Sequence, residues 1–230
     1  MRKQKLVSNN IYHVYNRGVE KRDIFIDDRD YLRFISDMGL FNDIHPAYNI
    51  GFKLRQSAID VGHQYTCCEN KLVDILAFCL MPNHYHLLLK QKIEDGISKF
   101  MKKLGGGYVN YFNVKYQRVG TLFQGKFKSV LMENTSQLLY IPHYIHLNPL
   151  DKFMPEWREK KINNKKGAVN FLNSYKWSSY SDYAGKSKFK DILEKDILSE
   201  YFGGPDEYAK DLNNFIGDMD LSGISDLVLE

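Results

Sequence analysis

The chain has 230 residues, of which 43% are hydrophobic, and this length and composition suffice for one sizeable core. No stretch approaches the roughly 18 apolar residues of a membrane span, and the basic residues 1–5 are not followed by an apolar signal core. We therefore expect a cytoplasmic protein. The three cysteines, Cys67, Cys68 and Cys79, are odd in number and two are adjacent, which argues against a disulfide framework or a four-cysteine zinc site.

The net charge of +4 hides an asymmetry along the chain. Residues 186–230 hold 5 Lys and no Arg against 11 Asp and Glu, a balance of −6, and the totals of 32 basic and 28 acidic residues leave residues 1–185 with 27 against 17, a balance of +10. A basic body suits a polyphosphate partner, and the aromatics interleaved with Lys and Arg over residues 100–127 suit unstacked single strands. An ordinary solvated surface is the alternative. We expect residues 186–230 to form an acidic, helical appendage that does not bind DNA.

The hydrophobic pattern predicts strands and helices in a mixed order. Predicted strands lie at 11–16, 72–80, 84–91 and 126–132, and predicted helices lie at 29–38, 96–115 and 135–147. Residues 41–70 fit no pattern and are expected to be an insertion. This order predicts an α+β fold over residues 1–185, a ferredoxin-like split βαβ sandwich with a central antiparallel sheet.

Two histidines stand two residues apart in the predicted strand at 84–91. Side chains alternate across a strand, so His84 and His86 share one face. A pair of imidazoles on a stiff element favours a divalent metal site, for which ligand chemistry alone suggests zinc, manganese or nickel. In the alternative reading, both histidines are partly buried strand residues without a ligand.

A tyrosine and an asparagine lie about one helical turn apart at the end of the predicted helix at 135–147. Tyr144 beside the amide of Asn148, whose oxygen can reach a metal, is a candidate nucleophile. Because tyrosine has a pKa of about 10, it needs a nearby base or a metal-polarised electrophile before it attacks a phosphodiester. Tyr140, one turn earlier, competes for the role, whereas the flanking His143 and His146 are expected to pack.

These residues resemble the single-tyrosine HUH transposases, the IS200-like family that includes the REP-associated tyrosine transposases. The family is named for a hydrophobic residue between two histidines, and Tyr85 at that position is a mild departure. The resemblance covers residues 9–185. Segments similar to the family's motifs occur in the family's order at 12–18, 25–28, 120–127, 144–149 and 175–180.

The resemblance implies that His84 and His86 bind Mg²⁺ or Mn²⁺, with Asn148 in place of the family's third ligand. It also implies that Tyr144 attacks single-stranded DNA and leaves a 5′-phosphotyrosine and a free 3′-OH, so that rejoining needs no nucleotide cofactor. The DNA is expected to carry a hairpin, and the protein is expected to be a homodimer with no membrane partner. The basic side chains predicted to contact DNA are Arg17, Lys102, Lys103, Lys115, Arg118, Lys126 and Lys128.

Two other classes of function stay open at this point. In the first, His84, His86 and a carboxylate form the site of a metal-dependent hydrolase, and Tyr144 only packs. A covalent protein–DNA adduct would separate that enzyme from a transposase. In the second, the chain is a DNA-binding module without catalysis, although every matched catalytic position is present.

Overall fold

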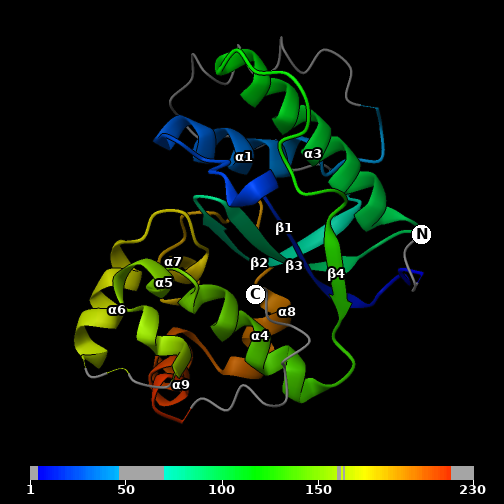
Figure 1. The fold of residues 1–230 in the computed structure, drawn as a ribbon. Coiled ribbons are helices and arrows are strands. Elements are labelled where there is room, and N and C mark those ends of the chain that lie inside the picture. The colour runs from blue at the N-terminus through cyan, green and yellow to red at the C-terminus, as the bar shows by residue number, and fades with distance from the viewer. Residues whose placement is uncertain (1–4, 47–69, 160–161, 163, 219–230) are drawn as a thin grey trace.

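The computed structural model describes residues 5–46, 70–159, 162 and 164–218. Four strands in these residues form one antiparallel sheet in the order β2-β3-β1-β4. Helix α1 connects β1 to β2 and helix α3 connects β3 to β4, which is the order of the ferredoxin-like split βαβ fold and confirms the predicted fold (Figure 1). The elements are β1 (Ile11–Arg17), α1 (Asp28–Leu40), β2 (Val73–Met81), β3 (His84–Gln91), α3 (Gly96–Lys115) and β4 (Lys128–Leu131).

The two faces of the sheet pack against different helices, because alternate residues of each strand point to opposite sides. Helices α1 and α3 cover one face, where Tyr85 and Leu87 of β3 join the core (Figure 1). Helix α4 (Thr135–Leu147) covers the other face, where Leu88 packs in one cluster with Ile141. The even-numbered residues of β3 therefore face α4.

Local sequence signals account for the elements that carry the site. The two-residue turn between β2 and β3 contains Pro82 and Asn83, and all nine residues of β2 are buried. Helix α4 begins after Asn134, whose side chain accepts a hydrogen bond from the backbone N–H of Gln137 at 2.9 Å. A strong cap of this kind fixes where the helix begins, and thereby the direction in which each later side chain points.

The chain continues from α4 through short helices that pack beside it. They are α5 (Leu150–Phe153), the 3-10 turn η2 (Pro155–Glu159), α6 (Lys165–Ser174), α7 (Tyr180–Tyr183), α8 (Asp196–Phe202) and α9 (Pro205–Asp218), and a shorter 3-10 turn, η1 (Val19–Lys21), follows β1. The backbone of Trp177 and Ser179 hydrogen-bonds the outer edge of β2 at 2.9 and 3.0 Å. No helix among the described residues is long and apolar enough to cross a bilayer.

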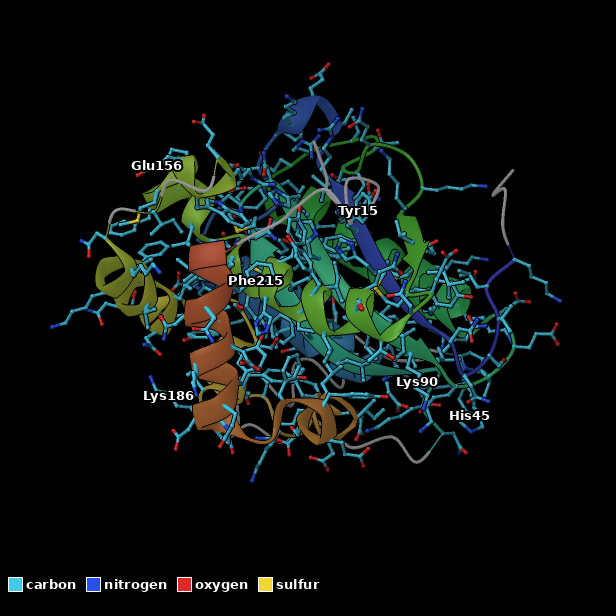
Figure 2. The ribbon with its side chains drawn as sticks, turned by 90° about the horizontal axis from the view of Figure 1, so that it is seen from below. Tyr15, His45, Lys90, Glu156, Lys186 and Phe215 are labelled. Atoms are coloured by element: carbon cyan, nitrogen blue, oxygen red, sulfur yellow. The ribbon has the colours of Figure 1, made fainter. Side chains whose placement is uncertain are left out.

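Within the described residues, the acidic C-terminal segment contains α8 and α9, and both share a core with α4. Tyr208, Leu212 and Ile216 of α9 are buried in the cluster that contains Ile141. The ring of Phe215, which Figure 2 labels on α9, lies 4.5 Å from the ring of Tyr140 between centroids. The division of the chain at residue 185 stays a prediction. Residues 47–69, most of the expected insertion, lie outside the described residues.

This packing predicts that the C-terminal helices stabilise the whole protein. Leu212→Ala is expected to lower the free energy of unfolding by about 2–5 kcal/mol, because it removes buried methyl groups and leaves a cavity. The neighbouring exposed Asp211→Ala is the matched control, with an expected change within about 0.5 kcal/mol. Urea denaturation followed by circular dichroism measures both. Equal effects of the two substitutions would show that α9 is not part of the cooperative core.

Candidate metal and nucleophile site

The structure brings the predicted histidines, tyrosine and asparagine together. The rings of His84 and His86 lie 5.0 Å apart between centroids at an interplanar angle of 88°. The ring of Tyr144 approaches His86 from α4 with centroids 5.7 Å apart at 90°. The amide of Asn148 donates to the carbonyl oxygen of Tyr144 at 2.8 Å, and its side chain is close enough to His84 to influence the pKa of that histidine. All four residues come from one chain, on two elements that face each other.

The histidine pair fits a divalent ion. Nδ1 of His84 lies 2.6 Å from Oδ1 of Asn83, and Nδ1 of His86 lies 2.8 Å from Nε2 of His13. Nε2 of His86 is buried and has no hydrogen-bond partner in the part of the chain that the structure describes. An imidazole nitrogen lies about 2.1 Å from a small divalent ion, which places two rings on one ion roughly 4.5–5 Å apart between centroids. The observed separation matches that value.

Within the part of the chain that the structure describes, a third protein ligand has to come from outside the usual His, Cys, Asp and Glu set. Among the described residues, no three His, Cys, Asp or Glu side chains are grouped so that they could hold a metal ion. Asp151 is engaged by the indole N–H of Trp157 at 2.6 Å and by two contacts of 2.8 Å from Arg158. The hydrolase reading would need the Asp151 carboxylate to leave these contacts, and Asn148 as the third ligand stays a prediction.

Burial keeps both histidines neutral. It lowers the pKa of His84 to about 4, against the opposing charge of Asp151, and lowers the pKa of His86 well below 6.5, with His13 and His84 adding to the effect. Metal ions bind the neutral imidazole. The two side chains are therefore in the state that binds a cation at pH 7.

An arginine that the sequence analysis did not single out lies over the tyrosine. The guanidinium carbon of Arg158 is 5.8 Å from the ring centroid of Tyr144, and the same side chain hydrogen-bonds the tyrosine. Its Nη2 also lies 3.4 Å from Oδ1 of Asn148. Arg158 belongs to η2, in a segment without a recognisable motif, so no local signal in the sequence could have pointed to it.

The other aromatic and histidine side chains of α4 point away from this site. Tyr140 packs against Phe215, whereas His143 lies among rings of α8 and α9, including Tyr208 at 4.7 Å between centroids. His146 bonds the hydroxyl of Tyr208 at 2.5 Å through Nδ1 and Oγ of Ser179 at 2.8 Å through Nε2. The geometry therefore favours Tyr144 over Tyr140, and His143 and His146 pack as expected.

The sheet register places two of the predicted DNA-contacting residues, Arg17 and Lys128, near the histidine pair. Arg17 stands opposite His84 in the register of β1 and β3, and its Nε donates to Gln124 at 2.6 Å. Lys126 is exposed just before β4. Lys128, the first residue of β4, is also exposed, and its Nζ lies 5.9 Å from the ring centroid of Tyr15, which Figure 2 labels. These cations lie where a polyanion could reach the site.

The remaining predicted contacts lie on α3 or just after it, on the opposite face of the sheet. Lys115 pairs with Asp27 and Asp30 at 2.7 Å, and Lys103 donates to backbone carbonyls that include His45. These bonds favour a structural role for both lysines. A DNA-binding role for this second group, which consists of Lys102, Lys103, Lys115 and Arg118, stays a prediction.

Part of the chain is similar to a known protein family. Residues 61–148, less than half of the chain, match the family described as IS200-like transposases, and this range contains all four site residues. No curated protein matches the chain closely enough to count as a relative. A solved structure described as a REP-associated tyrosine transposase bound to a REP hairpin is similar, with a TM-score of 0.45 and 12% identity over 86% of this chain and 92% of that chain. The part of the chain that carries the site is therefore similar to the IS200-like transposases.

Proposed function

We propose that this protein cleaves and rejoins single-stranded DNA as a transposase-type strand transferase with Tyr144 as its nucleophile. The observation that carries this proposal is the position of Tyr144, whose ring lies edge-on to His86 within one chain. The similarity of residues 61–148 to the IS200-like transposases supports DNA as the substrate. The metal-dependent hydrolase and the non-catalytic module are the competing functions.

Each residue of the site has a distinct role in the proposed reaction. His84, His86 and Asn148 would hold Mg²⁺ or Mn²⁺, and a divalent ion there stabilises charge on the phosphoryl oxygens. The phenol oxygen of Tyr144 loses its proton and attacks phosphorus, the bond from phosphorus to the 3′ oxygen breaks, and that oxygen leaves as a free 3′-OH. Because the new phosphotyrosine ester preserves the bond energy, a 3′-OH can later displace the tyrosine and reseal the strand.

Arg158 is placed to stabilise negative charge during this attack. Tyr144 is fully buried, so the side chains that cover it must shift when DNA reaches the phenol. The guanidinium already lies over the ring, and a fork of N–H donors suits phosphate oxygens. In the proposed reaction Arg158 therefore contacts the phosphate as the strand enters.

Arg158→Met is expected to slow cleavage by about 100-fold or more, the cost typical of losing one preorganised donor to a developing anion. Methionine keeps much of the apolar volume but removes the charge, so DNA affinity should also fall, by the contribution of one phosphate contact. The exposed Lys152→Met is the matched control and should cleave at the normal rate. Single-turnover cleavage measures the effect, after circular dichroism has shown that each variant is folded. A normal rate for Arg158→Met would remove Arg158 from the mechanism.

A labelled-strand experiment tests the proposed function. The full chain is incubated with Mn²⁺ and a pool of hairpin-bearing single strands with randomised flanks, labelled at either the 5′ or the 3′ end. A tyrosine transferase moves the 3′ label onto the protein in a denaturing gel and releases the 5′ label on a shortened strand. A hydrolase releases both labels on free fragments. A non-catalytic module leaves the strands uncut, and either of these last two outcomes contradicts the proposal.

A further inference from the structure

We infer that His13 and Asn83 are positioning residues that fix the tautomers of the two metal-binding histidines, so that both Nε2 lone pairs face the ion. The inference rests on the proposed function only in assigning a metal to His84 and His86. It is carried by the two hydrogen bonds at the Nδ1 atoms and by the unpartnered, buried Nε2 of His86.

The orientation of Asn83 determines the proton position on His84. The amide NH₂ of Asn83 donates to the carbonyl oxygen of Lys21 at 3.2 Å, which turns Oδ1 toward His84. An amide oxygen only accepts hydrogen bonds, so Nδ1 of His84 must carry the proton. Nε2 of His84 then carries no proton, and its lone pair can bind a metal ion.

A single proton lies between His13 and His86. If Nδ1 of His86 donates to Nε2 of His13, then Nε2 of His86 keeps its lone pair. In the opposite arrangement, Nε2 of His86 would carry the proton and could not bind a metal. Only the first arrangement is compatible with an ion at this site.

The packing around His13 holds this arrangement in place. Both His13 and His86 are 0% exposed, and their rings are nearly parallel, at 14°, with centroids 5.0 Å apart. His13 lies on β1, whose backbone pairs with β3 over the whole length of β1. The His13 ring on the neighbouring strand is thus a rigid hydrogen-bond acceptor. A hydrogen-bond partner that does not itself touch the ion, here called an outer partner, orients a metal ligand in this way.

Variants at His13 separate the hydrogen bond from simple packing. His13→Gln keeps an oxygen acceptor near the position of Nε2, whereas His13→Phe keeps a ring and removes the acceptor. We expect calorimetric Mn²⁺ affinity to fall about 10–100-fold in His13→Phe, the usual cost of losing an outer partner of a ligand, and to fall much less in His13→Gln. At the half-buried β2–β3 turn, Asn83→Ala should weaken Mn²⁺ binding and Asn83→Asp, which keeps an acceptor, should restore it.

The tautomers can be read directly in the metal-free protein. Long-range ¹H–¹⁵N NMR spectra are expected to show Nδ1–H on both His84 and His86. A proton on Nε2 of His86 in the wild-type protein would overturn the inference, as would wild-type Mn²⁺ affinity in a folded His13→Phe. If His13→Phe does not fold, the wild-type spectrum and the Mn²⁺ affinities of the two Asn83 variants test the inference.

The two proposals fail in different ways. A wild-type protein that binds Mn²⁺ with both Nδ1–H tautomers, but forms no DNA adduct, would overturn the proposed function and leave the positioning roles intact. A protein that forms the adduct while His13→Phe and Asn83→Ala bind Mn²⁺ normally would overturn the positioning roles alone. A wild-type protein without Mn²⁺ affinity would overturn both.

Discussion

Tyr144→Phe is expected to abolish covalent attachment to DNA and to leave DNA affinity nearly unchanged. The substitution removes only the attacking oxygen, because the ring keeps its edge contact with His86 and its place under Arg158. Transfer of a 3′ label from the strand to the protein measures the reaction, and fluorescence anisotropy measures the affinity.

Tyr140→Phe is the matched control, since Tyr140 lies on the same helix but packs against α9. It should still form the adduct. An inactive Tyr140→Phe together with an active Tyr144→Phe would reverse the assignment of the nucleophile.

His86→Ala is expected to remove both Mn²⁺ binding and DNA cleavage. Loss of one of three protein ligands should weaken Mn²⁺ affinity by more than the roughly 10–100-fold that loss of an outer hydrogen-bond partner costs. His84→Ala should behave in the same way, and Asn148→Ala should have a smaller effect, because a neutral amide oxygen is the weaker ligand. Isothermal titration calorimetry measures the affinity of each variant for Mn²⁺.

The matched control replaces a buried histidine that lies away from the pair. His143 lies among rings of α8 and α9, so His143→Phe should bind Mn²⁺ as the wild type does. Unchanged metal affinity in the variants of His84, His86 and Asn148 would contradict the metal site. A loss in His143→Phe that equals the loss in His86→Ala would point to a general change of structure instead.

The core of the site was predictable because it depends on local patterns. Strand alternation placed His84 and His86 on one face, and the β2–β3 turn kept that strand in register. The capping residue Asn134 fixed the start of α4, so the spacing from Tyr144 to Asn148 translated directly into one face of a helix.

The other features of the site depend on contacts between residues that are far apart in the sequence. The hydrogen bond from His86 to His13 crosses between strands, and Arg158 reaches Tyr144 from a short turn that no periodicity marks. Lys115 is predicted from the sequence to contact DNA, and the fold pairs it with Asp27. A count of charges along a helix cannot show which of them meet a partner from another element.

The C-terminal segment also shows that a count of charges does not reveal which residues pack on the core. Its net charge indicated an appendage, and the charged residues do lie on the exposed side of α9. The apolar residues Tyr208, Leu212 and Ile216, spaced by four, form the buried side. That spacing was the available signal for a helix packed on the core.

Mass spectrometry of the trapped adduct tests the central claim most directly. After reaction with Mn²⁺ and single-stranded DNA, nuclease treatment leaves a nucleotide on the attacking residue, and trypsin then releases the peptide spanning residues 129–152. This peptide contains Tyr140 and Tyr144, which fragmentation distinguishes. The proposed mechanism predicts the nucleotide mass on Tyr144, in wild-type protein with metal and in no sample with a chelator. A nucleotide on Tyr140, or cleaved DNA without any modified tyrosine, would contradict it.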